Sequence, residues 1–82
     1  MKIGQIVFSK AGRDKGKVLS VISSDNSGVY VVDGKERPLE RPKLKNPKHL
    51  VLTGYCLSEE ENRSNKALKA SIKRYQAKKD EL

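Results

Sequence analysis

Cationic side chains crowd into one short glycine-containing segment near the N-terminus, where their chemistry suits the binding of phosphate groups. Residues 7–22 contain two apolar, strand-like runs, and the loop between them carries four cations: Lys10, Arg13, Lys15 and Lys17. Asp14 is the only acidic residue of this loop, so the cations repel one another unless an anion screens them. Gly12 and Gly16 allow sharp bends that can turn backbone N–H groups toward a phosphate. The loop is therefore the first candidate site for a polyanion.

A second basic segment follows later in the chain. Prolines interrupt its cations, keep the backbone extended and prevent a helical period. A phosphate backbone bound by the first loop could continue along this segment, although a solvated loop would have the same composition. The cations of the segment are Arg37, Arg41, Lys43, Lys45 and Lys48. We expect the first three to extend the candidate site.

The residue types that catalysis and metal binding require are scarce. The single cysteine, Cys56, and the single histidine, His49, have no acidic residue to orient them as a nucleophilic pair, and they are too few for a zinc site. The neighbours of Cys56 predict a half-buried, structural thiol. The Gly-x-x-x-Gly-Lys-Val spacing at 12–18 lacks the pattern of a Walker loop. We predict no catalytic residue, metal, cofactor or small-molecule substrate.

Length and charge favour a small protein that binds nucleic acid. The chain has 82 residues and a net charge of +8. A chain this short forms one small domain, and such a charge favours polyanions through counterion release. A lone cysteine is typical of the reducing cytoplasm, the N-terminus lacks the apolar core of a signal peptide, and no apolar run is long enough to span a membrane. We therefore expect a cytoplasmic protein with no membrane partner.

Residues 1–57 have the pattern of a small β domain. β-Branched and apolar residues predict strands, and favoured turn residues separate them. The predicted strands are 3–8, 18–22, 29–32, an irregular strand at 36–39, and 50–52. Because closure removes exposed edges from so small a sheet, about five strands predict a small barrel.

Residues 58–82 predict a basic amphipathic helix. Ser58 and Glu61 have the spacing of a capping box, and the acidic residues there suit the positive end of the helix dipole. An apolar stripe at helical spacing consists of Leu68, Ile72 and Tyr75. This stripe either docks the helix on the β domain or pairs two chains, and the basic flanks suit the phosphates of an RNA.

Aromatic side chains that could stack on bases are few. They are Phe8, Tyr30, Tyr55 and Tyr75. Phe8 and Tyr30 have apolar neighbours that predict core positions. Without a stacking surface, recognition of folded RNA by shape and phosphate is favoured over sequence-specific recognition of single strands.

Residues 5–31 resemble the KOW motif, the RNA-binding element of several ribosomal proteins and transcription elongation factors. The phrase Ala-Gly-Arg-Asp-Lys-Gly-Lys-Val at 11–18 carries most of this resemblance, with Gly16 at the position of the hallmark glycine. Blocks at 2–7, 31–34 and 49–53 resemble, in the same order, the archaeal and eukaryotic large-subunit ribosomal protein of the fourteen-e type. The resemblance implies an SH3-like barrel, residues 1–57, that binds structured RNA through its loops and one face.

The expected function is that of a non-enzymatic RNA-binding protein, with ribosomal RNA as the main partner and ribosomal proteins as further partners. The expected RNA-binding residues are Lys10, Gly12, Arg13, Lys15, Gly16, Lys17, Arg37, Arg41 and Lys43. The tail is shorter than in the ribosomal relatives, so a permanent ribosomal protein and an accessory factor both fit. The alternative is a protein-interaction module of the transcription or translation machinery. Such a module needs an exposed apolar or aromatic patch, which the sequence does not reveal.

Overall fold

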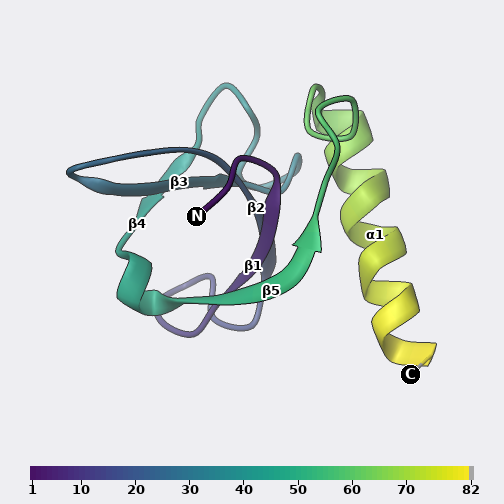
Figure 1. Ribbon diagram of the computed structural model, residues 1–82, viewed down its shortest axis with the longest axis horizontal. Coiled ribbons are helices and arrows are strands. Elements are labelled where there is room, and N and C mark those ends of the chain that lie inside the picture. Colours follow the sequence, from purple (N-terminus) through teal and green to yellow (C-terminus); the bar gives the residue numbers. More distant parts are fainter. Residues whose placement is uncertain (82) are drawn as a thin grey trace.

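The chain folds into an antiparallel β-sheet with a helix beside it (Figure 1). The computed structural model describes residues 1–81. The elements are β1 (Gln5–Ser9), β2 (Val18–Asp25), β3 (Gly28–Val32), β4 (Lys43–Lys45), a short 3-10 helix (Pro47–His49), β5 (Leu50–Cys56) and α1 (Asn65–Glu81). Neighbouring strands follow the order β4-β3-β2-β1-β5. The prediction of a mainly β chain with a C-terminal helix is confirmed.

The sheet curls, as Figure 1 shows, but it does not close into the expected barrel. Its two edges are β4 and β5, and no ladder joins them within residues 1–81. β4 has only 3 residues, and Pro47 then starts the 3-10 helix, so the chain leaves the sheet before a longer edge can form. Register shifts in the β1–β5 and β2–β3 ladders mark bulges, which bend the strands and account for the curl.

Alternation along the strands sends apolar side chains to both faces of the sheet. On β1, Val7 belongs to a cluster that contains no helix residue, while Ile6 belongs to the cluster under α1. Both side chains are fully buried. Phe8 and Tyr30, expected in the core, are only half-buried. The small sheet therefore has apolar packing on each side rather than one solvated face.

The apolar stripe of α1 docks on the chain's own sheet. Leu68 and Ile72 are buried against Ile6, Val32 and Leu57, with Tyr75 partly buried at the margin. Docking also requires a glycine after β3. Gly34 has φ +81°, and a Cβ there would lie 2.4 Å from the backbone oxygen of Asn65. The helix thus begins directly against a position that tolerates no side chain.

The helix begins later than predicted, at Asn65 rather than Ser58. The capping-box bonds between Ser58 and Glu61 do form, at 3.0 and 3.2 Å, but they close a separate turn. The Oδ1 of Asn62 accepts the hydroxyl of Ser20 at 2.7 Å, which ties that turn to β2. Ser64 caps α1 instead, because its Oγ accepts the N–H of Ala67 at 3.1 Å. Residue 82 of the predicted helix lies outside the described residues.

The predicted strand at 36–39 is wrong. Asp33 accepts the N–H groups of Lys35 and Arg37 through Oδ1, both at 2.8 Å, so the segment folds into a turn. The strand that pairs with β3 lies further on, at Lys43–Lys45. No helix within residues 1–81 is long and apolar enough to cross a membrane.

Candidate functional site

Loop 10–17 joins β1 to β2 and is fastened at its base by backbone hydrogen bonds. The N–H of Ser9 donates to the Lys17 carbonyl at 3.1 Å, and the Ser9 carbonyl accepts the N–H of Gly16 at 2.7 Å. Gly16 has φ +84°, and a Cβ there would have no atom within 4 Å, so backbone conformation alone favours glycine. Because its N–H is already bonded to Ser9, Gly16 does not offer that group to a phosphate, contrary to the expectation from sequence.

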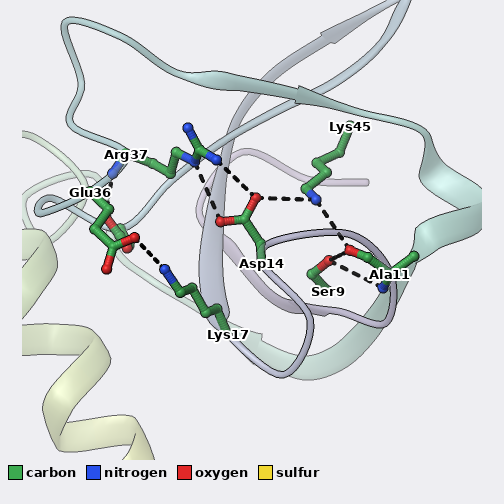
Figure 2. Close-up of polar contacts among 8 residues, drawn as sticks. Ser9, Ala11, Asp14, Lys17, Glu36, Arg37 and Lys45 are labelled. Atoms are coloured by element: carbon green, nitrogen blue, oxygen red, sulfur yellow. Dashed lines mark hydrogen bonds and ion pairs between the residues drawn. The ribbon is translucent and has the colours of Figure 1, made fainter.

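Asp14 points into the protein from the middle of this loop. Its side chain is 2% exposed, and Oδ2 lies 3.2 Å from Nη2 of Arg37 and 3.2 Å from Nζ of Lys45 (Figure 2). Nε of Arg37 also donates to Oδ1 at 3.4 Å. One buried carboxylate therefore connects loop 10–17 with the turn after β3 and with β4. We call Asp14, Arg37 and Lys45 the buried ion cluster.

The charge of the buried ion cluster follows from its geometry. Burial raises the pKa of Asp14, but hydrogen bonds and charge attraction from Arg37 and Lys45 outweigh it, so the pKa lies below its ordinary value. The carboxylate is thus ionised at neutral pH, and one anion stands between two cations. The cluster keeps a net positive charge beneath the loop.

Arg37 is held in place by the turn that contains it. The N–H of Arg37 donates to Oδ1 of Asp33 at 2.8 Å, and the N–H of Asp33 donates to the Arg37 carbonyl at 2.9 Å. With its backbone bonded in both directions, Arg37 presents its guanidinium to Asp14. Sequence reasoning treated Asp33 only as a turn residue with Gly34, and its spacing to Arg37 is the feature that could have indicated this contact.

A polar hollow of about 290 Å³ opens between loop 10–17 and the turn after β3. Arg13, Lys17 and Arg37 line it together with Asp14 and Glu36. Lys17 forms an ion pair with Glu36 across the hollow (Figure 2). The structure thus brings the two predicted basic segments side by side. A phosphate entering here would meet Arg13 directly and would compete with Glu36 for Lys17.

The other predicted residues do not line this hollow. They are exposed, and they are Lys10, Gly12, Lys15, Gly16, Arg41 and Lys43. Lys43 lies two positions before Lys45 on β4, so strand alternation places both on the same face. Lys45 itself is buried in the ion cluster and is not available to a ligand.

A lysine-rich groove continues from the loop to the helix. Its volume is about 540 Å³, and its cationic lining residues are Lys17, Lys35, Lys69 and Lys73. The spacing of Lys69 and Lys73 places them on one face of α1. Sequence reasoning missed this groove, because only the docking angle of α1 decides which helix face adjoins the loop.

No protein-family model and no curated protein matches this chain.

Proposed function

We propose that this chain is a non-enzymatic RNA-binding protein of the KOW type. The strand order and the position of the glycine-containing phrase between β1 and β2 support an SH3-like arrangement of the sheet, open between β4 and β5. The ligand we propose is structured RNA, ribosomal RNA above all, in the cytoplasm. Ribosomal proteins are further partners if the protein acts on the ribosome.

The observation that carries this proposal is the convergence of cations from three segments on one continuous surface. Loop 10–17 supplies Arg13 and Lys17, the turn after β3 supplies Lys35 and Arg37, and α1 supplies Lys69 and Lys73. These charges line adjoining hollows that share Lys17. A basic surface of this extent suits a chain of phosphates better than a single small anion.

The nature of the surface favours recognition of shape and phosphate. Its lining consists mainly of charged side chains, and no aromatic residue lines either hollow. Phosphate contacts position a nucleic acid without reading its sequence. Affinity on this surface should therefore depend strongly on salt and weakly on sequence.

The salt dependence of RNA binding tests the proposal. We expect Arg13→Ala with Lys35→Ala, two cations of this surface, to weaken binding of a folded RNA hairpin and to flatten the plot of log affinity against log salt by up to about two units, slightly under one for each lost phosphate contact. The matched control is Lys2→Ala with Arg63→Ala, which removes the same number of positive charges from exposed positions outside the basic surface. Equal slopes for the two double variants would refute the proposed site.

The alternative function, a protein-interaction module, is favoured by a different part of the molecule. An apolar cleft of about 580 Å³ lies between the N-terminus and the turn before α1, with Ile3, Ile22, Leu39 and Leu57 among its lining residues. Ile3 is 67% exposed. Sequence reasoning found no exposed apolar patch, because Ile3 was assigned to the first strand. A partner that stays bound after ribonuclease treatment and is released by Ile3→Asp would favour this function.

A further inference from the structure

An aromatic hollow lies on the other flank of α1, outside the basic surface described above. Tyr55 of β5 and Tyr75 of α1 face each other with ring centroids 5.3 Å apart and ring planes inclined by 51°. The hollow has a volume of about 230 Å³, and its remaining lining residues are Arg74, Ala77 and Lys78. We propose that this hollow binds one unpaired RNA base, which stacks on Tyr55 while the adjacent phosphates contact Arg74 and Lys78.

Tyr55 is presented to solvent in a fixed position. Tyr55 is 40% exposed. Its N–H donates to Oγ1 of Thr53 at 3.2 Å, and the Thr53 hydroxyl donates to the Ile6 carbonyl at 2.6 Å. These bonds fix the backbone at the irregular end of β5 against β1, and the ring of Tyr55 rests against that of Tyr75. Both restrict the ring before a ligand arrives, which lowers the entropy lost when a ligand stacks on it.

Tyr75 supplies the second wall. It packs at the margin of the cluster under α1, so its position is set by the core rather than by solvent. Because Tyr55 is partly exposed beside this tilted partner, its ring can take part in one more aromatic contact, and offset or tilted stacking is the geometry that aromatic groups prefer. Ligand pockets for larger molecules begin at about 300 Å³, so this smaller hollow suits a single flat ring.

The cations beside the rings favour a nucleotide base over an apolar peptide side chain as the ligand of the hollow. Arg74 is 69% exposed, and Nη2 is steadied by Oε2 of Glu61 at 3.2 Å and by Oγ of Ser71 at 3.1 Å. Lys78 is exposed at the same rim. A nucleotide joins a ring to a phosphate, which matches this combination of aromatic and cationic groups. The hollow thus reverses the expectation that the chain has no stacking surface.

This inference rests on the proposed function only in taking RNA as the ligand, because the two sites share no residue. The basic surface would bind the paired part of an RNA, and the hollow would bind a base displaced from the helix. RNA bulges and loops supply such bases. The protein would then prefer a duplex with an unpaired nucleotide to a perfect one.

Two blunt-ended RNA duplexes that differ only in one bulged adenosine test the inference, because neither has a loop. We expect the wild-type protein to prefer the bulged duplex. Tyr55→Ala should weaken binding of that duplex by about 5- to 140-fold, from the usual value of a stacked base, and leave binding of the perfect duplex unchanged. Tyr55→Phe should keep the preference, and Tyr55→Leu should lose it although it stays apolar. Equal binding of both duplexes by the wild-type protein, or no effect of Tyr55→Ala, would overturn the inference and leave the proposed function intact.

A second measurement tests the aromatic hollow in the case that the basic surface does not bind RNA. If the wild-type protein binds neither duplex, adenosine 5′-monophosphate is titrated into the protein and the ring resonances of Tyr55 and Tyr75 are followed by NMR. Shifts of both rings in the wild type, together with an unmoved Tyr75 ring in Tyr55→Ala, would uphold a base site without the basic surface. Unmoved resonances would overturn it.

Discussion

Loop 10–17 and helix α1 both carry cations to the proposed RNA surface, yet different forces hold them on the same sheet. The loop is held by the buried ion cluster, in which one carboxylate faces two cations. The helix is held by Leu68 and Ile72, which pack on apolar residues, and by its close approach to Gly34. The first attachment depends on ionisation and the second on shape. Charge and packing therefore control two halves of one surface separately.

The largest effect is expected where shape controls the surface. We expect Gly34→Ala to destabilise the protein by up to about 5 kcal/mol, because the left-handed conformation and the overpacked contact with α1 each cost free energy. A Cβ there would meet the Asn65 oxygen at 2.4 Å, whereas a Cβ at Gly16 would meet nothing within 4 Å. Gly16→Ala, with a similar φ, is thus the matched control and should cost only about 1–2 kcal/mol. Urea unfolding measures both, and equal losses would show that the approach of α1 is not tight.

The next effect tests the attachment of the loop. Asp14→Asn keeps the shape of the side chain but leaves Arg37 and Lys45 without their counter-charge, so we expect a loss of about 3 kcal/mol in unfolding free energy. Glu60→Gln changes an exposed carboxylate in the turn before α1 and should stay within about 0.5 kcal/mol of the wild type. Comparable small losses for both variants would mean that packing, rather than charge, holds the loop.

Low pH should weaken the ionic attachment of loop 10–17 and leave the apolar attachment of α1 unaffected. The folded-state pKa of Asp14 lies below its ordinary value of 3.8, so the unfolded chain binds this proton more readily than the folded one. The stability that Asp14 contributes is present above pH 3.8 and is lost as the pH falls through the lower folded value. The difference in unfolding free energy between wild type and Asp14→Asn should therefore be constant near neutral pH and shrink in acid. A difference that does not change with pH would contradict the ion cluster.

The smallest effect on stability is expected for the exposed ion pair between Lys17 of loop 10–17 and Glu36 of the turn after β3. Glu36→Gln releases Lys17, and because surface ion pairs contribute little, stability should change by less than about 1 kcal/mol. RNA binding should instead tighten, with a salt slope steeper by up to about 0.9 units from one added phosphate contact. Glu59→Gln removes the same charge from the turn before α1 and controls for net charge. The same gain in both variants would argue against a role for Lys17.

Local patterns predicted the parts of the fold that local forces decide. The β-branched run at 29–32 and the turn residues at 25–28 became β3 and the β2–β3 turn, because strand propensity and turn chemistry agree there. The start of α1 was wrong, since the capping box closes a separate turn, which a bond between Asn62 and the distant Ser20 ties to β2. The prediction of a closed barrel was wrong. It rested on the removal of exposed edges by closure and could not foresee that β4 has only 3 residues.

The candidate site was predictable in composition but not in arrangement. Residue types and spacing identified Arg13, Lys17 and Arg37, which the fold places around one hollow. They could not show that Asp14 turns inward, because its partners come from other segments. The exposure of Tyr55 was also hidden, since it depends on how the bulged end of β5 sits beside α1.

The long-range partners of Asp14 also have a consequence for the order of folding. Arg37 and Lys45 are 23 and 31 positions away in the chain, so the ion pairs of Asp14 form only after β3 and β4 have been placed, whereas the backbone bonds at the base of loop 10–17 are local. The ion pairs of Asp14 would then be absent from the transition state. Asp14→Asn should accelerate unfolding and leave the folding rate nearly unchanged in a chevron plot. A nascent or truncated chain that ends before β4 would carry the basic residues of the loop without their native arrangement.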